Sequence, residues 1–163
     1  MKRIFPIIAS VLLLLGMLTG CGRKAFTCGD LQIDIPGDFI ELSQPDTDGE
    51  NKDFLFGRDT LIVKGMAEKK SGLKQMSLQE YTDLMITGNE LDCSATVGRN
   101  GYRFVYRAEV GESTYTYFSA TFEGKDNFWS VQCYCPSEDF AKHQQTMEAL
   151  LDSVKTNLPF TAE

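Results

Sequence analysis

Cysteine thiols are the groups in this sequence best suited to covalent or metal chemistry, and four of them follow the N-terminal segment: Cys28, Cys93, Cys133 and Cys135. Four cysteines permit three disulfide connectivities. Cys133 and Cys135 lie two apart in a predicted strand, so both point to one face, and a bond between them would strain the extended backbone. A redox or metal site at this pair has no histidine or second close pair to support it. Small, buried, apolar cysteines are the competing interpretation.

Other candidates for catalysis are sparse. His143 is the only histidine; it falls between the apolar positions of a predicted helix, which indicates a partly exposed side chain. No Gly-x-Ser-x-Gly sequence or glycine-rich phosphate loop occurs. The acidic loop over residues 44–53 departs from the EF-hand pattern. We therefore expect neither an enzyme nor a bound cofactor or metal.

Three tyrosines form a candidate binding surface: Tyr106, Tyr115 and Tyr117. Rigid tyrosine side chains bury contact area at low entropic cost and keep a polar tip for hydrogen bonding. Under the competing interpretation, a helix over residues 77–87 covers these rings and they belong to the core.

The tyrosines belong to a predicted antiparallel meander over residues 102–135. Period-two alternation predicts strands over 102–110, 113–123 and 128–135, joined by a two-residue turn at Gly111-Glu112 and a four-residue turn at 124–127. This pairing gathers one core face of Val105, Phe118, Ala120, Phe122, Trp129, Val131 and Cys133. The opposite face carries Phe104, Tyr106, Tyr115, Tyr117 and Tyr134.

Further elements surround the meander. A hairpin over 26–35 turns at Gly29-Asp30, and a second strand pair covers 54–56 and 61–67. Ser77 and Glu80 form a capping box that starts the helix over 77–87. Ser137 is expected to cap a final helix whose apolar spacing extends to residue 158.

A short strand over 93–97 precedes Asn100-Gly101, a preferred dipeptide for two-residue hairpin turns. Such a turn pairs Val97 with Phe104 and places Cys93 on the face opposite Cys133 and Cys135. No disulfide from Cys93 to either of them is therefore expected.

The order of elements predicts a single α+β domain over residues 25–163, with a central, mostly antiparallel sheet and helices packed on it. The formal net charge is −7, and without residues 1–20, which contain Lys2 and Arg3 and no acid, it is −9. This acidity argues against nucleic acid as a partner and against electrostatic adhesion to anionic lipid.

The N-terminus has the organisation of a signal peptide. Lys2 and Arg3 precede an apolar run over residues 4–18, and Leu18-Thr19-Gly20-Cys21 follows. This tetrapeptide resembles the lipobox of bacterial lipoproteins. The resemblance implies cleavage of residues 1–20, lipidation of Cys21 with acyl chains such as palmitate, and a short tether over 21–24. The domain would then lie at the extracytoplasmic side of the cell membrane. A plain signal peptide and an uncleaved anchor are the alternatives.

The remainder resembles the PsbP-like domain of bacterial lipoproteins, in the superfamily that includes DcrB. The matching pieces are the strand over residues 31–39 with Ile35-Pro36 at its end, the meander, and the final helix closing on Asp152-Ser153-Val154. The resemblance implies a central antiparallel sheet with packed helices and no shared catalytic residue. A cystatin-like or NTF2-like α+β fold is the competing assignment.

These observations favour a lipid-anchored binding or accessory protein that is not an enzyme, with a protein or small molecule as its partner. The alternative is a thiol-based redox or metal-handling lipoprotein that uses Cys133 and Cys135. A small hydrolase with an unrecognised site is the least supported.

Overall fold

The computed structural model describes residues 22–42, 54–73 and 75–162. The predicted signal peptide, the lipidation site Cys21 and the acidic loop over residues 44–53 lie outside these ranges.

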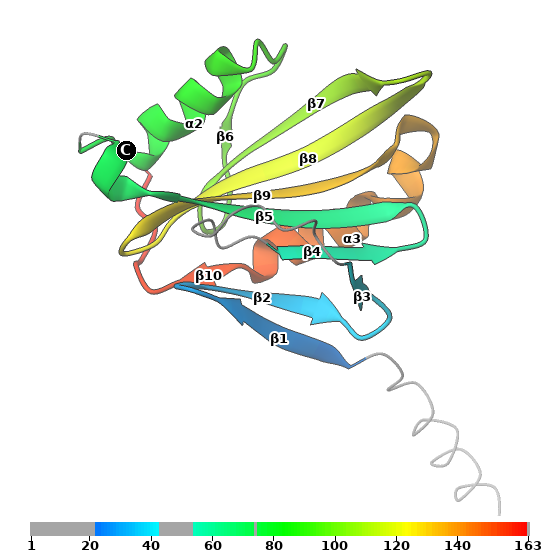
Figure 1. Ribbon diagram of the computed structural model, residues 1–163, viewed down its shortest axis with the longest axis horizontal. Helices are drawn as coiled ribbons and strands as arrows, with labels where there is room; N and C mark the ends of the chain where they lie inside the picture. Colours follow the sequence, from blue (N-terminus) through cyan, green and yellow to red (C-terminus); the bar gives the residue numbers. More distant parts are fainter. Residues whose placement is uncertain (1–21, 43–53, 74, 163) are drawn as a thin grey trace, which may run out of the picture.

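A seven-stranded antiparallel sheet forms the centre of the fold (Figure 1). Its strands, from one edge to the other, are β3 (Ile40–Glu41), β4 (Phe54–Arg58), β5 (Leu61–Lys69), β9 (Asn127–Pro136), β8 (Ser113–Glu123), β7 (Tyr102–Val110) and β6 (Thr96–Val97). The three long strands β7, β8 and β9 are the predicted meander, and β5 pairs with the outer side of β9.

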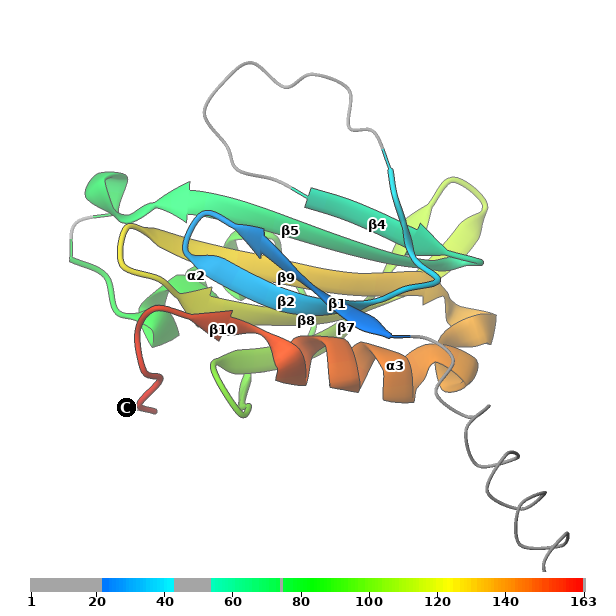
Figure 2. The same cartoon turned by 90° about the horizontal axis from the view of Figure 1, so that it is seen from below.

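A second layer covers one face of this sheet. It contains a small sheet in the order β1 (Arg23–Cys28), β2 (Leu31–Pro36) and β10 (Lys155–Thr156), beside helix α3 (Phe140–Ser153) (Figure 2). Helix α2 (Leu78–Gly88) lies on the other face, over one end of the sheet (Figure 1). Two short 3-10 turns, η1 (Lys70–Gly72) and η2 (Ser137–Asp139), complete the elements of the described residues. The α+β class and the antiparallel sheet predicted from the sequence are confirmed.

The main core lies between the two layers. Alternate residues of β2 point into it, and α3 adds Met147, Leu150 and Leu151 against Trp129 and Val131 of β9. A smaller cluster lies beneath α2 and contains Leu78, Tyr81, Tyr102 and Phe128, with the rings of Tyr81 and Phe128 stacked at 4.7 Å. Each helix therefore covers its own face of the sheet.

Local signals in the sequence predicted several details correctly. Val110 pairs with Ser113 and Glu123 with Phe128, so both meander turns have the predicted lengths. Ser77 accepts a hydrogen bond from the backbone N–H of Glu80, whose carboxylate accepts one from the N–H of Ser77.

The predicted two-residue turn at Asn100-Gly101 is wrong. Val97 pairs with Tyr102 instead of Phe104, and the N–H of Gly98 donates to the carbonyl of Gly101 at 2.8 Å. The loop therefore has four residues, and the strand before it is reduced to β6, which does not include Cys93. Because the register moves by two residues, the faces of the paired side chains do not change.

Three further predictions are corrected. The tether was expected to include residues 23–24, but β1 begins at Arg23 and pairs with β2 from there. Ser137 does not cap α3; its hydroxyl lies 2.8 Å from that of Thr116. Val105 shares the face of Phe118 but is 43% exposed, because α3 packs on β8 and β9 rather than over β7.

Candidate functional site

A row of aromatic rings crosses the sheet on the face that carries α2. Strand pairing sets Tyr106 of β7 beside Tyr117 of β8, Tyr117 beside Tyr134 of β9, and Tyr134 beside Ile62 of β5. The Tyr106 and Tyr117 rings are 4.8 Å apart and inclined by 4°, and those of Tyr117 and Tyr134 are 4.9 Å apart and inclined by 25°. Tyr115, in the next row, packs edge-on against Tyr134 at 6.4 Å. We call Tyr106, Tyr115, Tyr117 and Tyr134 the tyrosine surface.

Helix α2 does not cover the tyrosine surface. Its buried residues Leu78 and Tyr81 pack with Tyr102 and Phe128 instead, in rows nearer the other end of the strands. All four tyrosines are half-buried, whereas Tyr81 on the helix and Tyr102 beneath it are buried. Stacking covers part of each ring face, and the Tyr106 hydroxyl accepts a hydrogen bond from the Gln132 side-chain amide at 3.4 Å.

A groove of about 430 Å³ runs beside the rings. Its lining comes from the tyrosine surface, the β4–β5 turn and the ends of β7 and β9, and comprises Asp59, Thr60, Ile62, Val110, Tyr115, Tyr117, Tyr134 and Pro136. The lining is mostly apolar, and Asp59 supplies a carboxylate at one side. Such a mixture of apolar area and a few polar groups is typical of a binding site.

The phenols of Tyr106, Tyr117 and Tyr134 are neutral at physiological pH. Burial raises the pKa of Tyr106 to about 12, against a smaller opposing effect from Ser119. Burial also raises the pKa of Tyr117 and Tyr134, and neighbouring tyrosines add to both shifts. The hydroxyl groups can therefore donate and accept hydrogen bonds, but they are poorly suited to act as nucleophiles or general bases near pH 7.

The cysteines predicted as candidate sites lie apart from the groove. Cys133 and Cys135 are fully buried on the α3 face, and Cys93 is half-buried on the α2–β6 connection, close enough to Tyr106 to affect its pKa. Cys28 is half-buried at the end of β1. Cys93, Cys133 and Cys135 are thiols in this structure. Burial raises the pKa of the Cys133 and Cys135 thiols, which disfavours the reactive thiolate.

His143 is buried rather than partly exposed, which corrects the sequence-based prediction. The Thr60 hydroxyl donates to the Asp139 carboxylate at 2.6 Å, so the His143 Nε2, at 3.1 Å from the same hydroxyl, acts as donor to it. Burial lowers the pKa of His143, and Lys142 lowers it further. These two hydrogen bonds tie α3 to the β4–β5 turn. Because the Thr60 hydroxyl already donates its proton to Asp139, the three residues lack the arrangement of an activated nucleophile.

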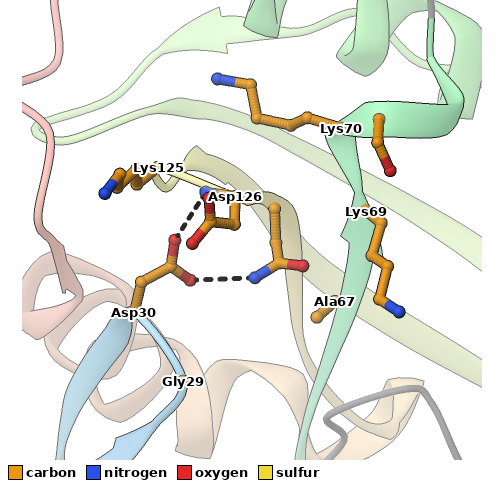
Figure 3. Close-up of a pocket in the computed structure, with 9 residues that line it drawn as sticks. Gly29, Asp30, Ala67, Lys69, Lys70, Lys125 and Asp126 are labelled. Atoms are coloured by element: carbon orange, nitrogen blue, oxygen red, sulfur yellow. Dashed lines mark hydrogen bonds between the residues drawn. The ribbon is translucent and has the colours of Figure 1, made fainter.

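A second cavity, of about 600 Å³, lies where the β1–β2 turn meets the β8–β9 turn (Figure 3). The Asp30 carboxylate accepts hydrogen bonds from the Trp129 indole at 2.7 Å and from Asn127 and the backbone N–H of Asp126 at 3.3 Å each. The labelled lysines of this cavity point in different directions, and Lys70 is 2.5 Å from Glu123. The polar groups at Asp30 thus join the two sheets, and we assign them a structural role.

Over residues 22–42, 54–73 and 75–162, no group of three or more histidine, cysteine, aspartate or glutamate side chains could hold a metal ion. Within the same ranges, no helix is both long and apolar enough to cross a membrane.

The sequence predicted three members of the tyrosine surface as site residues and missed the rest of the groove. Tyr134 was predicted to lie on the same face, but the contributions of Ile62, Thr60 and Val110 were not. The pairing of β5 with β9 that brings Ile62 and Thr60 to the rings joins segments far apart in the chain.

Comparison with known proteins identifies the fold. Neither a protein-family model nor a curated protein sequence matches the chain. Among solved structures, cyanobacterial PsbP (CyanoP) from Synechocystis superposes with a TM-score of 0.59 at 12% identity, over 83% of this chain and 92% of that one. A Bacteroides thetaiotaomicron protein superposes with a TM-score of 0.54 at 16% identity, over 84% of this chain, which spans 49% of that one. The fold is therefore PsbP-like, as predicted.

Proposed function

We propose that this protein is a lipid-anchored, extracytoplasmic binding module without enzymatic activity, and that its partner docks on the tyrosine surface. The observation that carries the proposal is the row of half-buried tyrosines beside a groove on the part of the sheet that α2 leaves open. Aromatic side chains with hydrogen-bonding tips are enriched among the residues that dominate protein–protein binding energy.

The anchor is proposed from the sequence alone. Lys2 and Arg3, the apolar run and Leu18-Thr19-Gly20-Cys21 support cleavage before Cys21 and acylation of its thiol. Since β1 begins at Arg23, the folded domain starts two residues after the proposed lipid. Substitution Cys21→Ala is expected to release the protein from the membrane fraction or leave it as precursor, and mature membrane-bound protein without an acyl group at Cys21 would contradict this.

The thiol-based alternative has less support. Redox-active or metal-binding cysteines need accessible sulfur with thiolate character. Cys133 and Cys135 are both 0% exposed, and their pKa values are raised by burial. We therefore assign them to the core.

The proposal is tested with the double variant Tyr115→Ser, Tyr117→Ser in the full-length, membrane-anchored chain. Proteins crosslinked to it in intact cells are quantified against wild type and against a matched control, Thr114→Ala, which changes an exposed residue of the same strand. We expect the specific adducts that form with wild type and with the control to be at least tenfold less abundant with the double variant. The melting temperature of the double variant should fall only modestly. Unchanged adducts, or unfolding of the double variant, would contradict the proposed docking surface.

A further inference from the structure

The outer edge of β7 is open along most of its length. Strand β6 pairs only with Tyr102 and Arg103, so residues 104–110 have a strand neighbour on the β8 side alone within the described ranges (Figure 1). The pairing with β8 runs without a bulge from Tyr102 to Val110, and the open stretch contains no proline. Val105 is 43% exposed and Val110 is 54% exposed. A long, regular, partly apolar edge of this kind is suited to pairing with another strand.

The backbone groups on this edge alternate in a defined way. Gly111, with a φ of 64°, occupies the first position of the two-residue turn, so Val110 and Ser113 form the closing hydrogen-bonded pair. Even-numbered residues of β7 therefore bond to β8, and Val105, Arg107 and Glu109 direct their N–H and C=O groups outward. The hydroxyl of Thr96 on β6 donates to the outward carbonyl of Arg103 at 3.3 Å, as this alternation requires.

The sequence of the edge is complementary to itself in one antiparallel arrangement. A two-fold axis perpendicular to the sheet must pass midway between the two copies of one residue, because paired side chains have to share a face. With the axis at Ala108, Arg107 lies opposite Glu109 of the second copy, and Tyr106 lies opposite Val110. An axis at Arg107 or at Glu109 would instead place like charges directly opposite each other, which is destabilising.

The side chains that would meet are available. Arg107 and Glu109 are both exposed, and neither has an ion-pair partner in the part of the chain that the structure describes. In the arrangement centred on Ala108 they form two cross-strand pairs of opposite charge. Tyr106 and Val110 form two pairs of an aromatic and a β-branched residue, a favourable combination across strands. Arg107 and Glu109 also lie in the outward-directed positions, so their backbones exchange the hydrogen bonds.

We propose that two copies of this protein pair through the outer edges of their β7 strands, antiparallel and centred on Ala108. The two seven-stranded sheets become one continuous sheet. The axis is perpendicular to the sheet, so both tyrosine surfaces face one side and both β1 strands lie on the other. The two N-terminal anchors of the proposed function could therefore enter the same membrane. The pairing itself rests on β7 alone and does not depend on that function.

The arrangement is tested by a disulfide across the axis, in the full-length chain in its native membrane. The two Ala108 residues form a non-hydrogen-bonded pair, with Cα atoms about 4.5 Å apart, which suits a disulfide. Under mild oxidation, Ala108→Cys is expected to give a covalent dimer at least fivefold above the wild-type background. Glu112→Cys, an exposed residue of the adjoining turn and off the axis, is the matched control and should stay near background.

Exchanging the charges of Arg107 and Glu109 provides a second test of the arrangement. Adding Arg107→Glu to Ala108→Cys places two acids opposite each other and should reduce the dimer at least threefold; adding Glu109→Arg as well should restore it. The melting temperature of each variant should stay within about 2 °C of wild type, because both residues are exposed. The proposal is overturned by equal dimer from Glu112→Cys, by insensitivity to the charge variants, or by a crosslinked product whose mass shows another protein at the edge.

Discussion

Asp30 is expected to be a large single contributor to stability because it joins the two sheets. Its carboxylate accepts a 2.7 Å hydrogen bond from the Trp129 indole, and Trp129 is 0% exposed. Gly124 lies so close that a Cβ there would be 2.1 Å from the Asp30 Oδ2 atom. The carboxylate therefore packs directly between the two turns.

The substitution Asp30→Ala leaves the buried indole N–H without an acceptor, which costs about 1–3 kcal/mol. The two hydrogen bonds of 3.3 Å are longer and partly exposed, and their loss adds about 1 kcal/mol. We expect the free energy of unfolding to fall by about 2–4 kcal/mol, measured by urea denaturation. Asp34→Ala is the control, because this carboxylate of the same small sheet accepts no hydrogen bond from the described residues; its effect should be below about 0.5 kcal/mol.

The pH dependence gives an independent check. Burial by itself would raise the pKa of Asp30, but the hydrogen bonds from Trp129, Asp126 and Asn127 outweigh it, so the pKa is lowered from 3.8. The ionised carboxylate therefore adds stability above pH 4, and this contribution is lost as the pH falls through the folded pKa. The stability difference between wild type and Asp30→Asn should shrink between pH 5 and pH 2. A loss below about 0.5 kcal/mol for Asp30→Ala, or a difference that does not vary with pH, would refute the reasoning.

The other predictions concern buried groups. Cys133 and Cys135 should resist thiol labelling in the native protein and react only after unfolding. Rapid labelling of the native protein would instead support a thiol-based redox or metal-handling function. Non-reducing peptide mapping should find no disulfide from Cys93 to either, since Cys93 lies beside Tyr106 on the other face. Because the pKa of His143 is lowered by burial, its contribution to stability should be complete above pH 6.5 and decline as the pH falls through the folded pKa, by at most about 1.4 kcal/mol per pH unit. His143→Gln should lack this decline, and parallel pH profiles for variant and wild type would argue against a buried neutral histidine.

Much of the fold could be predicted from the sequence because its strongest signals are local. The two meander turns fix the pairing of three long strands within a few residues of each turn, and the capping box starts α2 without help from the rest of the chain. Once this pairing is set, the common face of Tyr106, Tyr115 and Tyr117 follows from alternation alone. The predicted length of the loop before β7 was wrong because Asn100-Gly101 lies inside a four-residue turn closed by Gly98.

The remaining features depend on contacts between distant segments. Helical spacing could not indicate that Thr60 and Asp139 enclose His143, since the β4–β5 turn approaches α3 only in the folded chain. The exposure of Val105 depends on how far α3 extends across the sheet. The open edge of β7 could not be predicted either, because the sequence suggested a longer strand beside it than β6 provides.

The central claim, that the tyrosine surface meets a partner, is tested most directly by hydroxyl-radical footprinting of the full-length protein. Tyr115 and Tyr117 are compared between purified protein and native membranes, with Tyr102 as a buried reference and Ile40, which is 64% exposed, as an exposed one. We predict that both tyrosines are oxidised readily in the purified protein and at least threefold more slowly in native membranes, while Ile40 is unchanged. Equal oxidation of Tyr115 and Tyr117 in the two preparations, or protection as complete as that of Tyr102 in the purified protein, would contradict the claim.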